Sequence, residues 1–359
     1  MRLRFCLARV QTQGHGLGNE LVPWARAFLA SQVLNARLLP PAFGLNRREY
    51  WRHFGTAPDD WIYNRALERL LPVVEFTEAD WLEHGGDDVA TALRGFAAAR
   101  GLQRRSAYVL VTEGLWGGFH HVQAAREFMR ATLYQSRFAA GNLLRLRERI
   151  DPDKILVGMH VRLGDFRAPG DARDTRTGNV SLPLDWFCNI ADSLRAQLAD
   201  GLQFLLVSDG TPAQLQPLMQ RIPCITSADL PDGDCSDALA LADSDLLVCS
   251  ASTYSHLAAF LSDSPYIWFA PNLYRHPEGC YFAGNPEADL QRSDSPRSRA
   301  LREFKAHRDD WPARGFALDH DGQVPGALIE QLRQRHARRR WQADILRGGV
   351  MAAPPAPGG

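Results

Sequence analysis

Short apolar segments alternate with longer segments of helical periodicity along most of this chain. Residues 2–10 alternate polar and apolar positions as a strand does, and after the glycine-containing loop 11–19 the residues Leu21 and Trp24 begin a helical pattern. A second series of the same kind begins with the apolar run 155–161. Short apolar strands that alternate with helices are typical of parallel sheets with helices on both faces. The pattern therefore predicts an α/β fold.

The predicted elements fall into two series that meet near residue 150. In the first series, a strand at 108–112 precedes a loop and a helix at 122–134, whereas the region 40–105 has no regular period. In the second series we expect strands at 155–161, 203–207, 246–249 and 266–269, and helices at 186–199, from Thr211 onward, at 237–242 and at 255–261.

The length of 359 residues exceeds what one compact core usually fills. We expect an N-terminal α/β domain at 1–150, a C-terminal α/β domain at 151–325, and a cleft between them. Ligands of such sheets bind at the carboxyl ends of the strands. A basic helix at 326–350 and a disordered tail at 351–359, which is poor in large apolar side chains, are expected to follow.

Composition narrows the range of partners and locations. Lys plus Arg and Asp plus Glu both total 41, so the overall charge predicts no nucleic-acid partner. The six cysteines form no C-x-x-C pair and are expected to be reduced and structural. Arginines interrupt the N-terminus before a signal-peptide core forms, so we expect a cytoplasmic location. The basic run 335–341 is either a solvated helix face or a peripheral contact with the inner membrane surface.

The segment His160-Val-Arg-Leu-Gly-Asp165 directly follows a predicted strand and so lies at the ligand-binding edge of its sheet. Arg162 offers a fixed fork of donors suited to phosphate, and Asp165 is close enough in sequence to hold that fork in one orientation. An ion pair without any ligand is the alternative.

Hydroxyl residues cluster after the predicted strand 246–249. Ser250, Ser252 and Thr253 stand where a helix begins, and the free N–H groups of a helix start favour phosphate. Helix capping needs only one such hydroxyl. The cluster therefore predicts the second wall of an anion site beside Arg162.

Carboxylates supply weaker candidates. Asp209 follows the strand 203–207 and is expected either to accept bonds from a base or ribose or to start a turn. The pattern Asp-x-Asp, which some enzymes use to hold a divalent ion, occurs at 151–153, 232–234 and 243–245. These copies precede strands or fill turns, so we interpret them as solvated turn carboxylates and predict no metal site.

Glycines and aromatic residues of the first half complete the candidates. Gly16, Gly18 and Asn19 lie in a strand-to-helix loop without the Lys of a P-loop or the third glycine of the dinucleotide motif, which predicts a tight turn. Trp116 and His120, from the loop after the next strand, are candidates to line the cleft on the acceptor side.

Taken in order, these segments resemble the fucosyltransferase superfamily, which includes bacterial α-1,2-fucosyltransferases, nodulation and core α-1,6-fucosyltransferases and protein O-fucosyltransferases. Gly16-Leu-Gly-Asn19 is similar to the opening glycine loop of the α-1,2 group. His160-Val-Arg162, with Asp165 after it, is similar to the shared H-x-R segment that grips the donor. Val207-Ser-Asp209 is similar to the next strand end.

The last matching segment contains Asp237 and the stretch from Asp245 to Thr253. It resembles the region of the α-1,6 group that places a guanosine-contacting Asp and phosphate-contacting hydroxyls. The resemblance implies a GT-B architecture of two facing Rossmann-like domains and an inverting glycosyltransferase. It further implies GDP-fucose as donor, a glycan or other hydroxyl compound as acceptor, and no required metal or cofactor.

The donor and the general base each have alternatives in this sequence. Leu163 stands where many relatives carry a second Arg, so a GT-B transferase with another nucleotide sugar is one alternative, and a non-catalytic nucleotide-sugar or carbohydrate-binding domain is another. The general base for the acceptor hydroxyl is expected among Asp165, Asp171 and Asp174.

Overall fold

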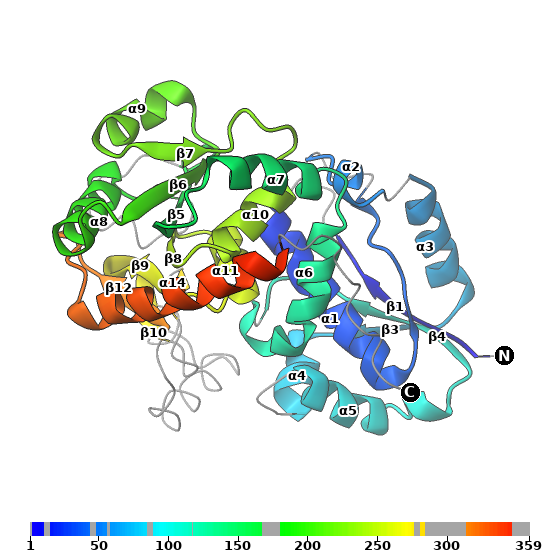
Figure 1. The fold of residues 1–359 in the computed structure, drawn as a ribbon. Coiled ribbons are helices and arrows are strands. Elements are labelled where there is room, and N and C mark those ends of the chain that lie inside the picture. The colour runs from blue at the N-terminus through cyan, green and yellow to red at the C-terminus, as the bar shows by residue number, and fades with distance from the viewer. Residues whose placement is uncertain are drawn as a thin grey trace.

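A computed structural model of the chain describes residues 2–10, 15–43, 48–55, 58–84, 89–116, 118–166, 180–275, 281–283 and 314–346. It contains two parallel sheets with helices packed on their faces (Figure 1). This arrangement confirms the predicted α/β class. None of the helices described here is both long and apolar enough to cross a membrane.

The first sheet has four parallel strands in the order β2-β1-β4-β3. β1 is buried over most of its length and pairs with β4 from Leu3↔Ala107 to Ala8↔Thr112. The strands are β1 (Leu3–Ala8), β2 (Arg37–Leu38), β3 (Val73–Phe76) and β4 (Ala107–Thr112). The helices of this half are α1 (Leu17–Leu34), α2 (Trp51–Phe54), α3 (Pro58–Leu70), α4 (Glu78–His84), α5 (Val89–Ala99), α6 (Arg126–Tyr134) and α7 (Ala139–Arg149), with 3-10 turns at Leu102–Arg104 and His120–Ala125.

The second sheet has six parallel strands in the order β12-β9-β8-β5-β6-β7. From the central β5 the chain builds outward to β6 and β7, then returns to β8 on the other side. The strands are β5 (Ile155–Val161), β6 (Leu202–Ser208), β7 (Cys224–Thr226), β8 (Leu246–Val248), β9 (Tyr266–Phe269) and β12 (Gly315–Leu318), and β10 (Leu273–Arg275) pairs separately with β11 (Tyr281–Ala283). The helices are α8 (Leu184–Leu198), α9 (Pro212–Arg221), α10 (Asp234–Ala242), α11 (Thr253–Leu261) and α14 (Gly326–Leu346), with a 3-10 turn at Ala270–Asn272.

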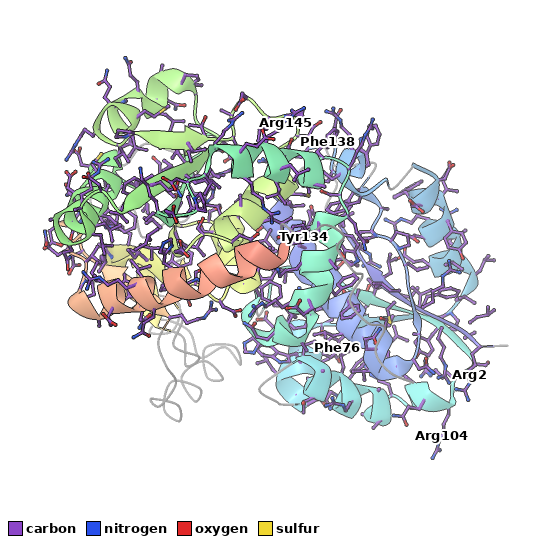
Figure 2. The ribbon with its side chains drawn as sticks, viewed as in Figure 1. Arg2, Phe76, Arg104, Tyr134, Phe138 and Arg145 are labelled. Atoms are coloured by element: carbon purple, nitrogen blue, oxygen red, sulfur yellow. The ribbon has the colours of Figure 1, made fainter. Side chains whose placement is uncertain are left out.

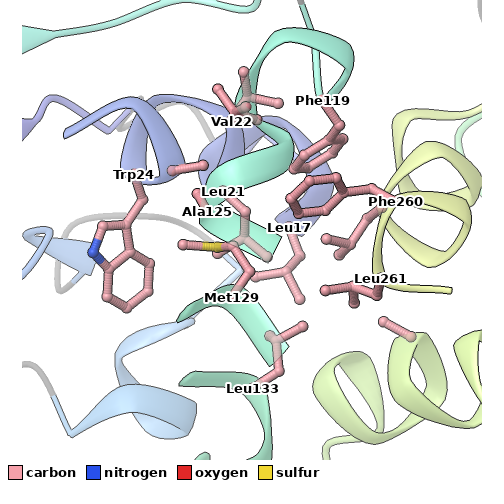
Figure 3. Close-up of a cluster of buried hydrophobic side chains, with 14 of the residues drawn as sticks. Leu17, Leu21, Val22, Trp24, Phe119, Ala125, Met129, Leu133, Phe260 and Leu261 are labelled. Atoms are coloured by element: carbon pink, nitrogen blue, oxygen red, sulfur yellow. The ribbon is translucent and has the colours of Figure 1, made fainter. Parts of the chain in front are cut away.

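An apolar layer of α1, α6, α10 and α11 joins the two sheets. Figure 3 shows Leu17 and Leu21 of α1 facing Met129 and Leu133 of α6, with Phe260 and Leu261 of α11 on the other side. Phe119 stacks on Phe260 with ring centroids 4.9 Å apart. One continuous core cluster therefore spans both halves of the chain.

Two smaller core clusters cover the outer faces of the sheets. On the first sheet, Leu67 of α3 packs near Phe5 and Val109. On the second sheet, α8 contributes Trp186, and α14 contributes Leu328 together with its neighbours. The side chains of the basic run from residue 337 onward lie outside the described residues, so the membrane contact stays a prediction.

Most predicted elements of the second half appear within a few residues of their expected bounds. Thr211 caps α9 through a capping box with Gln214, as the Thr-Pro pair indicates. The prediction missed β7, and it left the region that forms α2 to α5 without assignment. It also placed Gly18 and Asn19 in a loop, whereas α1 begins at Leu17 and includes both.

Gly18 is the point of closest approach between α1 and α11. A Cβ atom at Gly18 would lie 2.6 Å from the backbone oxygen of Thr253, which is nearer than packing allows. We expect Gly18→Ala to lower the free energy of unfolding by about 1–3 kcal/mol, because a backbone segment must move. Chemical denaturation measures this change.

Gly141, in α7, provides the matched control, because a Cβ there meets nothing within 4 Å. Gly141→Ala should raise the free energy of unfolding by roughly 0.5–1 kcal/mol through helix propensity alone. Equal effects of the two substitutions would show that the α1–α11 contact is not tight.

Candidate functional site

The candidate site lies at the switch point of the second sheet, between β5 and β8. From these adjacent strands the chain continues in opposite directions across the sheet, and a crevice forms at such a point beyond the carboxyl ends. Arg162 follows β5 directly, and Ser250 comes two residues after β8. The two segments singled out from sequence are thus brought together.

Arg162 is held by carboxylates on two sides. Its Nη2 lies 2.5 Å from Oδ1 of Asp165, and its Nη1 lies 2.6 Å from Oδ2 of Asp209. The side chain of Arg162 is 15% exposed, and its guanidinium carbon lies 5.2 Å from the centre of the Phe166 ring. These contacts fix the donor fork in one plane.

Asp209 is engaged by groups of the chain itself, and its contact with a base or ribose stays a prediction. Its carboxylate binds Arg162 and accepts a bond from the backbone N–H of Leu163 (2.9 Å). A Cβ at Gly164 would lie 2.1 Å from Oδ2 of Asp209, so any other residue there would push the carboxylate out of its place. Asp209 is therefore a positioning residue for Arg162.

Ser250 connects the ends of β5 and β8. Its hydroxyl donates to the carbonyl of His160 (2.7 Å) and accepts from the backbone N–H of Arg162 (2.9 Å). Ser208, at the end of β6, donates to the carbonyl of Val161 (2.6 Å) on the other side. The backbone that carries Arg162 is thus anchored to both neighbouring strands.

His160 is buried beneath this backbone. Its Nδ1 lies 2.7 Å from the hydroxyl oxygen of Ser255, and its ring lies 5.0 Å from the ring of Tyr254. Burial, together with the positive charge of Arg162, lowers the pKa of His160 to about 3. A neutral imidazole therefore supports the site from below, and His160 is not placed to contact a ligand directly.

The start of α11 forms the other wall. Ser252 is the N-cap, and its hydroxyl accepts from the backbone N–H of Tyr254 (3.3 Å). Among the described residues, Thr253 makes no side-chain hydrogen bond, so its hydroxyl can serve a ligand. Gly18 packs against the Thr253 backbone, which brings the start of α1, with Gly16 as its N-cap, to the same place.

Asp237 lies in the first turn of α10 and is linked to the site through Tyr254. The hydroxyl of Tyr254 donates to the carbonyl of Asp234 (2.5 Å), which places its ring between α10 and His160. Burial raises the pKa of Asp237 to about 7, although a hydrogen bond from Ser227 opposes the shift. Within the described part of the chain, Oδ1 of Asp237 is buried without a hydrogen-bond partner.

Arg48 is a site residue that the sequence did not reveal. Its Nη2 lies 3.3 Å from Oδ2 of Asp165, so Asp165 is shared by a guanidinium from each half of the chain. Arg48 stands in the region without regular periodicity, 117 positions before Asp165. A local sequence pattern cannot predict an ion pair between residues so far apart in the chain.

The predicted acceptor-side residues receive less support. Trp116 is half-buried, stacks on Trp81 with centroids 5.7 Å apart, and carries the guanidinium of Arg26 3.7 Å above its ring. Its role in the described structure is packing, so a contact with an acceptor stays a prediction. The side chain of His120 and the candidate bases Asp171 and Asp174 lie outside the described residues.

The Asp-x-Asp carboxylates at 243–245 are structural, so their interpretation as solvated turn residues is wrong. Asp245 is fully buried and accepts from the backbone N–H of Leu156 (2.8 Å). Asp243 binds Arg130 (2.7 Å) and the hydroxyl of Tyr134 (2.8 Å), which Figure 2 shows on α6. Among the described residues, no three His, Cys, Asp or Glu side chains are grouped so as to hold a metal ion.

No protein-family model and no curated protein sequence matches this chain. Among solved structures, it is similar to NodZ α-1,6-fucosyltransferase soaked with GDP-fucose, with 15% identity, 75% of this chain and 94% of that chain covered, and a TM-score of 0.44. Fucosyltransferase NodZ from Bradyrhizobium gives 15% identity, 73% and 93% coverage, and a TM-score of 0.43. POFUT1 in complex with GDP gives 11% identity, 74% and 98% coverage, and 0.41. At these identities and TM-scores, the function of this chain rests on the residues of its own site.

The buried state of His160 predicts a pH-dependent stability. The unfolded chain binds a proton at His160 below the ordinary pKa of 6.5, whereas the folded chain resists protonation down to about 3. Acidification therefore favours the unfolded chain. The free energy of unfolding should fall through this residue as the pH drops below 6.5, with a slope that approaches about 1.4 kcal/mol per pH unit near pH 5.

Denaturant titrations of the wild type and of His160→Gln at several pH values measure this contribution. In the variant, the free energy of unfolding should depend less steeply on pH by the contribution of His160, whatever the stability of the variant at pH 7. A variant with the full wild-type slope would contradict the buried neutral state of His160.

Proposed function

We propose that this chain is an inverting glycosyltransferase of GT-B type that transfers fucose from GDP-fucose to a glycan or another hydroxyl acceptor. The observation that carries the proposal is the clamped fork of Arg162 at the switch point between β5 and β8, opposite the start of α11. A guanidinium fixed in this way, beside free helix N–H groups, suits the diphosphate of a nucleotide sugar. The ordered resemblance to fucosyltransferase segments supports fucose as the sugar.

The charges of the site favour a diphosphate that replaces the carboxylate of Asp165 as the partner of two arginines. Arg48 and Arg162 share the carboxylate of Asp165, whose side chain is 61% exposed and free to turn toward solvent. A diphosphate that displaces Asp165 gains charge-assisted hydrogen bonds from both guanidinium groups. Asp209 stays on the far side of Arg162 and keeps the fork in its plane.

The proposed reaction is a direct displacement at the anomeric carbon. The acceptor oxygen forms the new glycosidic bond, the bond from that carbon to the β-phosphate oxygen breaks, and GDP leaves with the electron pair. Arg162, the Thr253 hydroxyl and the start of α11 stabilise the negative charge that grows on GDP. Because these donors are held in place before the reaction, the transfer is proposed to proceed without a metal ion.

Two further roles are recognition of the guanine base and deprotonation of the acceptor hydroxyl. Asp237 is proposed to accept hydrogen bonds from the guanine base, because its Oδ1 is buried without a partner among the described residues. Without a diphosphate both oxygens of Asp165 are engaged by guanidinium groups, and a bound diphosphate would release them, so the base that deprotonates the acceptor is proposed to be one of Asp165, Asp171 and Asp174.

A thermal-shift panel with GDP-fucose, GDP-mannose, UDP-glucose and free GDP separates this function from its two alternatives, a transferase that uses another nucleotide sugar and a non-catalytic binding domain. Only a ligand of the folded state raises the melting temperature. We expect GDP and GDP-fucose to raise the melting temperature and UDP-glucose to leave it unchanged. A rise with UDP-glucose and none with GDP or GDP-fucose would indicate another donor. Slow hydrolysis of GDP-fucose would exclude a non-catalytic binding domain.

Arg162→Ala should lower the rate of GDP-fucose turnover at least a hundredfold, because a main donor to the leaving group is lost. Arg221→Ala is the matched control, since Arg221 also lies between two carboxylates, Asp185 and Asp192, but on α9. The released GDP is measured for both variants. Near-normal turnover in Arg162→Ala would refute the assignment of the site.

Arg48→Ala should weaken GDP binding about tenfold, since one charge-assisted contact is removed while Arg162 keeps its clamp. Arg52→Ala is the control from the same segment, because Arg52 binds Asp232 instead (2.9 Å). Isothermal titration with GDP measures both affinities. If Arg48→Ala binds GDP as the wild type does, Arg48 only neutralises Asp165.

A further inference from the structure

The first sheet has a switch point of its own, which the proposed donor site does not use. From β1 the chain goes outward to β2, and the later strands β3 and β4 lie on the opposite side of β1. Arg9 follows β1 and Glu113 follows β4, and their side chains meet at 2.9 Å. A crevice at the carboxyl ends of these strands is therefore expected for the same reason as in the second sheet.

A cavity of about 480 Å³ lies beside this point, between Arg9, helix α3 and the start of β3. This volume lies within the range of small-molecule sites. Figure 1 shows α3 on the outer side of the first sheet, beside β1. The cavity is lined by Arg9, Trp61, Arg65, Glu68, Arg69 and Val73.

An aromatic side chain forms one wall of this cavity. Trp61 is 37% exposed, although tryptophan in a soluble protein is normally well buried. The guanidinium of Arg65 lies 5.9 Å from its ring centre and steadies it. The neighbouring Val73 and Leu70 are exposed as well, so apolar surface gathers around the opening.

Three of the four charged side chains of the lining, Arg9, Arg65 and Glu68, form ion pairs with one another or with neighbouring carboxylates. Arg9 binds Glu68 (3.0 Å), Glu75 (3.1 Å) and Glu113 (2.9 Å). Glu68 is only 10% exposed and also binds Arg65 (2.9 Å). Arg9, Arg65 and Arg69 of the lining are balanced by Glu68 and by the neighbouring Glu75 and Glu113, so the region is close to neutral in total charge, which disfavours a phosphate or another strongly anionic ligand.

We propose that this cavity binds a neutral oligosaccharide, with one sugar ring stacked on Trp61 and its hydroxyls bonded to the Arg9–Glu68–Arg65 network. A sugar ring has an apolar face that fits an indole, and vicinal hydroxyls that both donate to carboxylates and accept from guanidinium groups. Resting on the proposed function, the site is the subsite for the part of the acceptor glycan remote from the reacting hydroxyl.

Isothermal titration of the full chain with cellotetraose, maltotetraose, N-acetylchitotetraose and a sulfated heparin tetrasaccharide tests the proposal. At least one neutral tetrasaccharide should bind. Its affinity should fall tenfold or more in Trp61→Ala and be partly kept in Trp61→Phe, which retains a ring. Tyr63→Ala is the matched control, since Tyr63 is an exposed aromatic residue of the same helix outside the cavity lining.

Three results would overturn the proposal: no neutral tetrasaccharide binds, only the sulfated one binds, or Trp61→Ala and Tyr63→Ala bind as the wild type does. A melting temperature of Trp61→Ala near that of the wild type separates loss of the site from loss of the fold. Titration of the wild type with GDP in the same series keeps the two proposals apart. Saccharide binding without GDP binding would refute the donor site and leave the saccharide site standing.

Discussion

The apolar layer between α1 and α11 is the constraint on which the arrangement of both sheets depends. Each sheet buries one face against its own helices, and the second face of each packs into a shared layer that contains α1, α6, α10 and α11. The close contact of Gly18 with the Thr253 backbone fixes the spacing of this layer. The same contact brings two helix starts, each with free N–H groups, to the crevice of the second sheet. Packing and the electrostatic character of the site therefore have one cause.

Within the site, Arg162 is held by direct contacts, and the residues that make these contacts are held by further hydrogen bonds. The guanidinium binds Asp165 and Asp209, the backbone beneath it is bonded to Ser250, and Ser250 and His160 both contact Ser255 through hydrogen bonds. Positioning of this kind is what a preorganised electrostatic site requires, since the groups need no rearrangement as charge develops. Arg48 differs from the rest, because it comes from the other half and lies on an exposed carboxylate.

Sequence reasoning located features that depend on position along a strand and missed those that depend on distant contacts. Arg162 and Ser250 were found because each follows an apolar run, and strand ends of a parallel sheet share one edge. Arg48 was not found, because its ion pair with Asp165 exists only once the halves have packed. Asp245 looked like a turn residue, yet it is buried because the backbone N–H of Leu156 needs an acceptor there.

Ser250 also explains how β5 and β8 can separate at the switch point. The backbone pairing of β5 with β8 stops at Met159↔Val248, and beyond that pair the strands diverge. Strands that separate normally leave an N–H and a C=O without partners, which is costly away from water. The hydroxyl of Ser250 replaces the missing rung of the ladder, because it serves the carbonyl of His160 and the N–H of Arg162 together. The side chain of Ser250 thereby takes over the pairing of the two strands at the point where Arg162 begins the site.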